Sequence, residues 1–565
     1  MKDVLTQQAL HDLLIDTGLV EEKELLLAAE RVKNEGGTFS QALLWFNFIS
    51  EEDLGKIIAD ALNVPFVVLE AQDIPEEVLQ IIPEVVSKKH CTVAFALDEN
   101  GLRIATTHPE ERELPDFLEK KTGLAVKVCY ATPRDVQNAL SRYNKNAIQA
   151  FDELISGDLE AAQSNGKETD PPIIRIVDTL VSYAYQNRAS DIHIEPREKD
   201  MLVRFRIDGI LNDIVKLPPT LHPQIIARIK VLAKLPTDEH QTPLDGKIEF
   251  ILEGNTRVDV RISVIPTTEG EKVVLRLLSE RSRQFSLTNL GMQPDVLAKL
   301  EEAYKKPYGM VLVTGPTGCG KTTTLYAILK LLNRRDVNIV TIEDPVEYDI
   351  EGISQIQVNP AVNLNFSTGL RSILRQDPNV ILVGEIRDDE TADIAVNLAM
   401  TGHIVLSTLH TNNAATTIPR LIDMKIEPFL IASTINIIVA QRLMRKIHMN
   451  CRVSEETVSE EVAKRIGKEM FEKVFGEVTP GRKIRLYRGK GCPACHGTGY
   501  EGRVGIFEAL IVDDAIREAI VRQENASVIE ELAIVSGMRT MFESGLINVQ
   551  QGLTTIDEVL RATTE

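Results

Sequence analysis

Tryptophan and cysteine are scarce in this sequence, and long uncharged apolar runs are absent from it. Aromatic residues make up 5% of the chain, with a single tryptophan. No apolar run approaches the roughly 18 residues of a membrane-spanning helix, because the longest candidate, residues 428–440, is interrupted by Ser433, Thr434 and Asn436. Residues 1–8 also lack the apolar core of a secretion signal. We therefore expect a cytoplasmic protein that reaches a membrane only through partners.

Positive charge is also in short supply. The chain has 63 Lys and Arg against 83 Asp and Glu, a formal net charge of −20. This balance argues against a protein that coats itself with nucleic acid, although it does not exclude local basic patches on the surface. We expect no direct nucleic-acid partner. At 565 residues the chain is too long for one core, so about three to four domains are expected.

Residues 315–322 read Gly-Pro-Thr-Gly-Cys-Gly-Lys-Thr, a complete phosphate-binding loop. Residues 309–314 before it predict a buried strand, and residues 323–332 after it have helical apolar spacing. Strand, glycine loop and helix aim backbone N–H groups at phosphate oxygens. Lys321 would reach the β- and γ-phosphates, and the Thr322 hydroxyl would bind Mg²⁺. The predicted nucleoside-triphosphate site comprises Gly315, Pro316, Thr317, Gly318, Cys319, Gly320, Lys321, Thr322 and Thr323.

Further candidate residues follow later strands. Residues 338–342 form a predicted strand that ends at Glu343, which could position or deprotonate a water attacking the γ-phosphate; a solvated acidic turn is the alternative. Residues 380–383 end in Gly384-Glu385, where Asp-Glu is usual, so Glu385 would serve Mg²⁺ and its waters alone or with another residue. His403 and His410 bracket the predicted strand 404–409 and could contact phosphate or be structural.

Three of the six cysteines suggest a metal site. Cys91, Cys129 and Cys319 stand apart, whereas Cys492 and Cys495 lie among glycines, and His448 with Cys451 offers a second pair. Because cytosolic disulfides are rare, we expect these four residues to bind structural Zn²⁺ as a Cys3His set. His496 beside Cys495 leaves the nitrogen ligand open, and reduced, metal-free cysteines are the alternative.

The sequence predicts four segments. Residues 1–145 form an N-terminal docking domain, with a tandem helical repeat of about 29 residues over 1–64 and an α/β part over 65–145. Residues 146–170 are polar and predict a flexible linker. Residues 171–285 predict a second, α+β domain, with a helix over 173–186 and strands over 201–207, 248–252, 257–264 and 273–278. Residues 286–565 predict a parallel sheet covered on both faces, with the cysteine knuckle at about 445–500.

Taken together, the motifs resemble those of a known family. Four segments look like the motifs of the type II secretion and type IV pilus assembly ATPases. They resemble the Walker A motif (residues 315–322), the Asp box (341–347), the Walker B motif (374–388) and the His box (401–412). Five further segments are similar to other parts of that family, namely residues 189–196, 204–209, 270–278, 499–508 and 552–561. The resemblance covers essentially the whole chain. Retraction ATPases of the same superfamily lack the long N-terminal region and the knuckle, so the assembly or secretion branch is favoured.

The resemblance implies a RecA-like P-loop motor domain preceded by a PAS-like α+β domain. It implies a homohexamer that hydrolyses ATP with Mg²⁺ and carries Zn²⁺. Glu343 is the implied general base and Glu385 the acid on the Mg²⁺ side, while Arg261 and Arg276 would swing onto the γ-phosphate.

The implied function is type IV pilus assembly by pilin polymerisation. It would proceed through an inner-membrane platform protein and associated cytoplasmic assembly proteins, with the motor peripheral to the inner membrane. A type II secretion pseudopilus ATPase is the alternative. A DNA-uptake or DNA-translocation ATPase and an inactive scaffold are less favoured.

The chain departs from the family pattern in three places. His448 replaces a knuckle cysteine, and Lys247 replaces an arginine near the domain junction. The N-terminal repeats resemble the family's cyclic-di-GMP module only in their apolar frame, because residues 9–11 and 38–40 lack its Arg-Leu-Gly opening. Without those arginines, the stacking and phosphate contacts that an anionic dinucleotide needs are lost. We therefore expect a docking domain and no cyclic-di-GMP binding.

Overall fold

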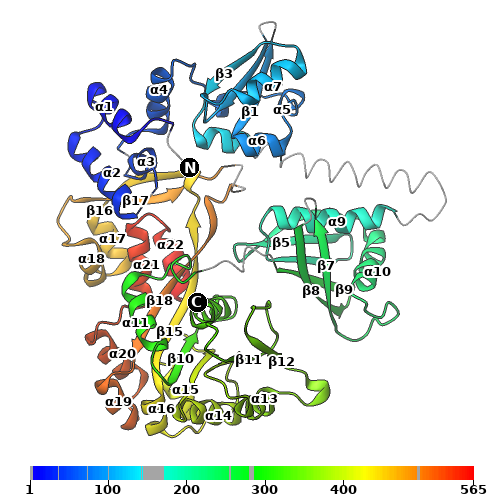
Figure 1. The fold of residues 1–565 in the computed structure, drawn as a ribbon, viewed down its shortest axis with the longest axis vertical. Coiled ribbons are helices and arrows are strands. Elements are labelled where there is room, and N and C mark those ends of the chain that lie inside the picture. The colour runs from blue at the N-terminus through cyan, green and yellow to red at the C-terminus, as the bar shows by residue number, and fades with distance from the viewer. Residues whose placement is uncertain are drawn as a thin grey trace. The chain divides into compact units, whose positions relative to one another are not determined.

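The computed structural model in Figure 1 describes residues 4–140, 143 and 171–564, apart from 36, 47, 73, 99–100, 253–255, 279–285, 493–494 and 496. The chain divides into two compact units. The first contains Met1–Glu168, His448–Ser454 and Gly489–Tyr500; the second contains Thr169–Ile447, Glu455–Arg488 and Glu501–Glu565. The expected linker at 146–170 lies outside the described residues, as do the predicted boundaries at 145 and 285.

Four helices open the first unit, as the repeat predicted: α1 (Gln7–Thr17), α2 (Glu22–Glu35), α3 (Phe39–Phe46) and α4 (Glu51–Ala61). The Ser50 hydroxyl accepts a hydrogen bond from the Asp53 backbone N–H at 3.0 Å and so caps α4. Leu10 and Leu14 of α1 belong to the same buried core as Leu43 of α3 and Leu54 of α4. The apolar spacing of the repeat therefore builds one shared core.

A small α/β part follows in the same unit. Its sheet has the order β1 (Thr92–Asp98), β2 (Gly101–Thr106), β3 (Val126–Tyr130), with β1 antiparallel and β3 parallel to β2. Helices of this part include α5 (Glu76–Leu79), α6 (Glu84–His90) and α7 (Glu113–Thr122), and residues 133–140 are also helical. Alternate side chains of the sheet enter different cores, since Val93 belongs to one cluster and Ala94 to the other.

The second unit begins with an α+β part. Helices α9 (Pro171–Gln186) and α10 (His222–Leu232) accompany a six-stranded sheet of order β6-β5-β4-β9-β8-β7. The strands are β4 (Asp191–Pro196), β5 (Met201–Ile207), β6 (Ile210–Leu217), β7 (Leu244–Leu252), β8 (Thr256–Thr267) and β9 (Gly270–Leu278). Strands β5, β7, β8 and β9 were expected, whereas β4 and β6 were not.

A seven-stranded sheet forms the centre of the rest of the second unit. Its order is β12-β11-β13-β14-β10-β15-β18. The strands are β10 (Gly309–Thr314), β11 (Ile339–Glu343), β12 (Ser354–Gln357), β13 (Val380–Val383), β14 (Ile404–Leu409), β15 (Ile435–Ile447) and β18 (Tyr500–Ile511). Strands β10 to β15 pair in parallel wherever they are neighbours. Their carboxyl ends therefore share one edge.

Helices cover both faces of this sheet, as expected. Met310 and Leu312 of β10 face the core that α13 (Phe366–Ile373), α14 (Asp389–Met400) and α16 (Pro428–Thr434) complete. Val311 and Val313 face the opposite core, with α11 (Pro294–Tyr304) and α12 (Lys321–Leu332). The apolar run at 428–440 is thus divided between α16 and the buried start of β15.

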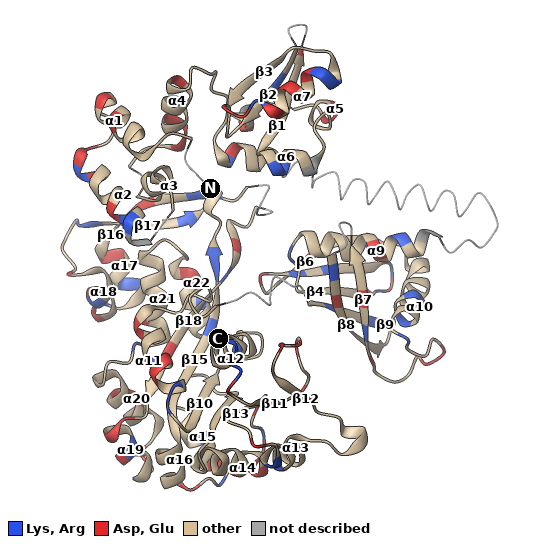
Figure 2. Ribbon diagram, in the orientation of Figure 1, with Lys and Arg blue, Asp and Glu red and all other residues tan. Residues whose placement is uncertain are grey.

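The remaining elements are short. They include the helices α15 (Thr417–Asp423), α17 (Ser459–Ile466), α18 (Lys468–Phe475), α19 (Asp514–Val521), α20 (Ala526–Val535), α21 (Met541–Gln550) and α22 (Ile556–Thr564), with a two-stranded sheet of β16 (Arg452–Val458) and β17 (Lys483–Gly489). Figure 2 shows acidic and basic positions interspersed along these elements. In the part of the chain that the structure describes, no helix has the length and apolarity to cross a bilayer.

Candidate nucleotide-binding and hydrolysis site

The glycine loop between β10 and α12 has a backbone that only glycine adopts easily. Gly315, Gly318 and Gly320 have φ angles of 143°, 80° and 91°. A Cβ on Gly315 would lie 2.4 Å from the carbonyl oxygen of Gln441 in β15. The loop is thus folded tightly against the neighbouring strand, as the motif requires.

Lys321 is buried at the start of α12 and bonds to its own loop. Its Nζ donates to the carbonyl oxygens of Gly315 at 2.7 Å and Pro316 at 3.1 Å. Burial lowers the pKa of this ammonium group, and the nearby Glu385 carboxylate opposes that shift. A phosphate would replace the loop carbonyls as the partner of Lys321.

Gln441 connects the loop, the helix and β15. Its Nε2 donates to the carbonyl oxygen of Cys319 at 2.7 Å, and its Oε1 accepts from the Thr324 hydroxyl at 2.7 Å. Gln441 is buried, so these bonds are shielded from water. The sequence motifs gave no signal for this residue.

Glu343 lies at the end of β11, as predicted, but its carboxylate points into the protein. Its side chain accepts hydrogen bonds from the hydroxyls of Tyr326 and Thr341 and from the Gln355 amide. The residue is 2% exposed. A solvated acidic turn, the alternative interpretation of the sequence, is therefore wrong for this side chain.

Glu385 follows β13 at the same edge of the sheet. Its Oε1 lies 2.7 Å from Nη2 of Arg387, and its Oε2 lies 3.2 Å from Nε2 of His410. The preceding Gly384 lies close to β11, since a Cβ there would be 3.2 Å from the Cα of Glu343. An aspartate in that position would crowd the neighbouring strand, which gives a physical reason for the glycine.

The two histidines lie at opposite ends of β14. His410 follows the strand and contacts Glu385 at the carboxyl edge. His403 precedes the strand, and its Nδ1 bonds to the Leu398 carbonyl oxygen at 3.0 Å. The structure does not bring His403 to the loop, which favours the structural interpretation for that residue alone.

The two predicted arginines are neighbours in the six-stranded sheet, where Arg261 of β8 pairs in register with Arg276 of β9. Nη1 of Arg261 lies 3.1 Å from Oε2 of Glu347, four residues beyond Glu343. Nε of Arg276 donates to Oδ1 of Asp191 at 2.9 Å, yet its side chain is 61% exposed. Both guanidinium groups are thus held by acids and lie outside the glycine loop.

The predicted Cys3His set comes together in the first unit. The ligand atoms of His448, Cys451, Cys492 and Cys495 all lie within 4.8 Å of one another. Nδ1 of His448 is 3.3 Å from Sγ of Cys492. His496, the other candidate nitrogen ligand, lies outside the described residues.

The cluster has the donor chemistry of a zinc site. Burial raises the pKa of the Cys495 thiol, but backbone hydrogen bonds from Cys492 and Gly499 outweigh burial and lower it. Those N–H groups point at a sulfur that is a better acceptor as a thiolate. Three buried sulfurs and one imidazole nitrogen fit a closed, tetrahedral, structural Zn²⁺ site.

Comparisons with known proteins show the family of this chain. The family described as type II/IV secretion system protein matches residues 166–561. The chain belongs to this family. The MshEN domain family matches residues 62–150. The expected fold class is confirmed, with a RecA-like motor preceded by α+β and helical parts.

Relatives of two kinds match nearly end to end. The type IV pilus assembly ATPase PilB of Myxococcus xanthus is 38% identical over 98% of this chain and 98% of its own. Type II secretion system protein E of Xanthomonas campestris is 40% identical over 96% and 97%. An X-ray structure of the Yersinia pseudotuberculosis ATPase DotB covers 69% of this chain and 93% of its own, with a TM-score of 0.51 and 19% identity, and supports the fold alone.

In this secretion-family chain, sequence reasoning missed the residues that hold the predicted ones. Glu508 of β18 is an example, because its Oε1 accepts from the Ala414 N–H at 2.9 Å and so anchors the segment after His410. Burial raises the pKa of the Glu508 carboxyl. Glu508 lies within residues 499–508, one of the segments that resemble the family, so its position had a signal in the sequence. Tyr326 and Gln355 had no such signal.

Proposed function

We propose that this protein is an ATPase motor that powers type IV pilus assembly by driving pilin polymerisation at the inner membrane. The observation that carries the proposal is the meeting of Lys321, Glu385 and His410 at one edge of the sheet, in a chain of the type II/IV secretion system protein family. The nearly full-length match to a pilus assembly ATPase supports the pilus reading. The equally long match to a type II secretion protein supports a pseudopilus ATPase as the second candidate.

ATP would bind over the glycine loop. The backbone N–H groups of residues 315–323 and the Nζ of Lys321 bind its phosphates, which offsets the loss of the bonds from Lys321 to Gly315 and Pro316. The Thr322 hydroxyl and Glu385 hold Mg²⁺, which supplies charge stabilisation on the phosphate oxygens. Glu343 acts as the general base toward the attacking water.

Arg261 and Arg276 supply the remaining positive charge. The two arginines are register partners on neighbouring strands of the six-stranded sheet. Arg261 already contacts the loop after Glu343, because it forms an ion pair with Glu347. Moving them from Glu347 and Asp191 onto the γ-phosphate links hydrolysis to domain closure, because a guanidinium stabilises charge developing there. Repeated closure in a homohexamer would act on the platform protein.

The other parts support this motor. The Cys3His cluster holds structural Zn²⁺, and residues 1–145 form a docking domain for the platform protein and associated cytoplasmic assembly proteins. The motor is cytoplasmic and peripheral to the inner membrane. Neither nucleic acid nor cyclic-di-GMP is a direct ligand, since the net charge is −20 and the repeats lack the arginines that such a dinucleotide needs.

Steady-state ATPase assays on the full chain test the enzymatic part. Lys321→Ala should abolish turnover and weaken ATP binding, whereas Glu343→Gln should keep binding and stop chemistry. Lys305→Ala is the matched control, because Lys305 is an exposed lysine whose ion pair with Glu301, one helical turn earlier, lies at the surface. A Glu343→Gln variant that hydrolyses ATP at the wild-type rate would remove Glu343 as the base.

Deletion and complementation in the source cell separate the two biological roles. A deletion strain that loses surface pili but still exports exoproteins supports the pilus assignment. The reverse phenotype supports the pseudopilus ATPase.

A further inference from the structure

Tyr326 forms the centre of a buried hydrogen-bond network around Glu343. Its hydroxyl donates to Oε2 of Glu343 and accepts from the backbone N–H of Glu347 at 3.3 Å and from Nε2 of Gln355 at 3.4 Å. On the other carboxylate oxygen, Oε1 accepts from the Thr341 hydroxyl at 2.6 Å and from Gln355 at 3.2 Å. Both oxygens of the acid are therefore engaged by protein donors.

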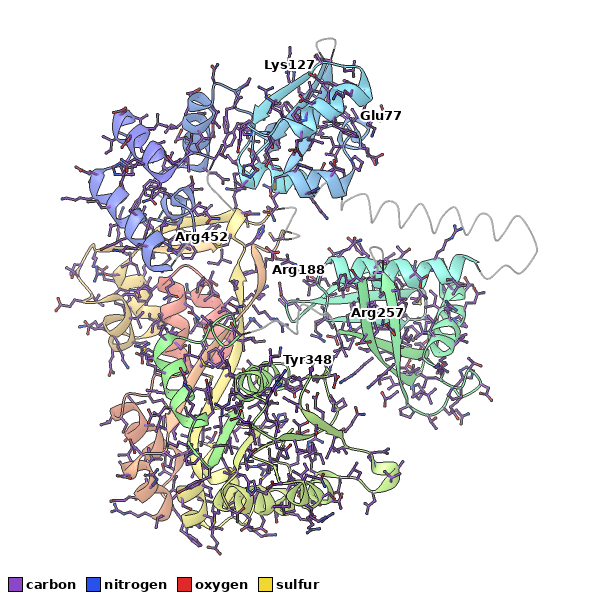
Figure 3. All side chains as sticks on the ribbon, viewed as in Figure 1. Glu77, Lys127, Arg188, Arg257, Tyr348 and Arg452 are labelled. Atoms are coloured by element: carbon purple, nitrogen blue, oxygen red, sulfur yellow. The ribbon has the colours of Figure 1, made fainter. Side chains whose placement is uncertain are left out.

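The ring of Tyr326 is fixed as firmly as its hydroxyl. Tyr326 is fully buried, and it packs edge-on against Tyr348 with ring centroids 4.8 Å apart (Tyr348 is labelled in Figure 3). Burial, followed by the adjacent Glu343 carboxylate, raises the pKa of the Tyr326 hydroxyl. The hydroxyl therefore stays protonated and remains a donor to Glu343.

A general base cannot work in this arrangement. It needs a free lone pair within hydrogen-bond distance of a water, about 2.6–3.2 Å away. Glu343 is 2% exposed and so has no access to bulk water, and protein donors take three of the roughly four lone-pair directions of its carboxylate. Turnover therefore requires the carboxylate to leave this network and turn toward the phosphate edge.

We propose that Tyr326 is a positioning residue that holds Glu343 in a closed, inactive conformation until the loop after β11 moves. This inference rests on the proposed role of Glu343 as the general base. The loop that must move carries Glu347, whose backbone bonds to Tyr326 and whose side chain pairs with Arg261 of the six-stranded sheet. Departure of Arg261 from Glu347 would thus loosen the network at the moment when the arginine reaches the nucleotide.

Single-turnover hydrolysis by the full chain tests this inference, with ATP affinity measured in parallel by titration of a fluorescent ATP analogue. Tyr326→Phe removes only the hydroxyl and keeps the ring against Tyr348. Because the released carboxylate reaches water more often, we expect the hydrolysis rate to rise about threefold or more while affinity stays unchanged. Thr341→Val is isosteric and removes the other hydroxyl that donates to Glu343, so it should also raise the hydrolysis rate.

Matched controls separate this effect from general loosening of the fold. Tyr304→Phe removes a hydroxyl from another buried tyrosine of the same part, in α11, and should leave rate and affinity unchanged. In the Glu343→Gln background, Tyr326→Phe should give no acceleration, because the group that it releases is missing.

The outcomes distinguish this inference from the proposed function. The inference would be overturned if Tyr326→Phe and Thr341→Val hydrolyse ATP at or below the wild-type rate with normal affinity. If Glu343→Gln is inactive in the same assay, the proposed ATPase function still holds. Wild-type hydrolysis by Glu343→Gln would instead remove the base itself, and the inference with it.

Discussion

The Nε2 of Gln441 lies 2.7 Å from the carbonyl oxygen of Cys319, so a residue of β15 holds the phosphate-binding loop from outside the motif. Its Oε1 also accepts from Thr324 of α12 at 2.7 Å. The glycine loop is flexible by composition, and this buried amide fixes its path at the point where α12 begins.

Gln441→Leu should therefore weaken ATP binding. It removes two buried hydrogen bonds and leaves the Thr324 hydroxyl without its acceptor, so we expect a loss of about tenfold or more in affinity. Equilibrium titration with a fluorescent ATP analogue measures this. Gln550→Leu on the exposed side of α21 is the control, and equal affinity in the two variants would contradict the prediction.

Arg276→Ala and Arg261→Ala should reduce turnover by on the order of 10-fold or more while ATP still binds, as lost arginine contacts do in phosphoryl transfer. Both lie in the six-stranded sheet, so the fold of the motor part should be unaffected. Steady-state ATPase activity beside nucleotide affinity measures the effect.

Arg257→Ala is the matched control for the arginine variants, because Arg257 lies on the same strand with a side chain that is 70% exposed. Near-normal turnover in the Arg261/Arg276 double variant would mean that the charge comes from elsewhere. Candidates are a neighbouring subunit and Arg206 of β5, whose Nε lies 3.6 Å from Oδ2 of Asp191, the partner of Arg276.

The freshly purified, chelator-free protein should contain about one zinc per chain. Elemental analysis measures this, and Cys492→Ser should lower the zinc content, whereas Cys91→Ser, outside the cluster, should not. Absence of any transition metal from the wild-type protein would contradict the assignment.

The sole tryptophan gives this prediction a second readout. The guanidinium carbon of Arg452, next to Cys451, lies 3.9 Å from the centre of the Trp45 ring, and that of Arg31 lies 3.7 Å from it (Arg452 is labelled in Figure 3). Removal of zinc by a chelator should disturb this stacking and shift the Trp45 emission.

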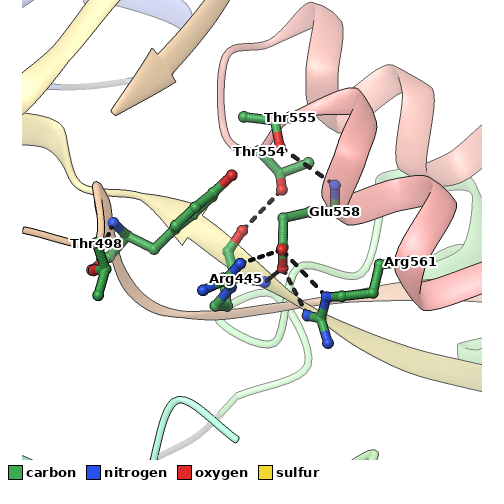
Figure 4. A network of polar contacts seen from close by, with 7 residues as sticks. Arg445, Thr498, Thr554, Thr555, Glu558 and Arg561 are labelled. Carbon is green, nitrogen blue, oxygen red and sulfur yellow. Dashed lines mark hydrogen bonds and ion pairs between the residues drawn. The ribbon is translucent and has the colours of Figure 1, made fainter. Parts of the chain in front are cut away.

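Glu558 should contribute stability that depends on pH. In Figure 4 its carboxylate accepts from Nη2 of Arg445 at 2.5 Å and from Nη2 of Arg561 at 2.7 Å. Burial raises the pKa of the Glu558 carboxyl, but these hydrogen bonds outweigh burial and lower it from 4.5 to about 2. The stabilisation is therefore fully present above pH 4.5 and is lost as the pH falls toward 2.

Glu558→Gln should lower the free energy of unfolding at neutral pH by about 2–3 kcal/mol. The difference from the wild type should shrink as the pH falls from 5 toward 2. Thermal unfolding across this range measures it, with Glu518→Gln on the exposed face of α19 as the control, because its ion pair with Arg522 lies at the surface. A difference that is independent of pH would contradict the prediction.

The sequence by itself determined the elements that carry local signals. The glycine loop, strands β10, β13 and β14 and the helical repeat at 1–64 follow from motif and apolar period, which depend on near neighbours. The ligand spacing of His448, Cys451, Cys492 and Cys495 likewise predicted one cluster, and the four residues do come together. The predicted domain boundaries remain predictions.

Only the tertiary structure decided which predicted residues meet and in what state. The sequence places His403 and His410 at opposite ends of β14, but only the parallel pairing of β14 with β10 and β13 shows that the end with His410 is the one that carries Glu385. Tyr326, Gln355 and Gln441 carry no motif, because their roles depend on hydrogen bonds to residues that are distant in the chain. The inward direction of the Glu343 carboxylate was also decided by the tertiary structure. The sequence specifies an acid at the end of a strand, whereas packing against α12 and β12 decides which way its carboxylate points.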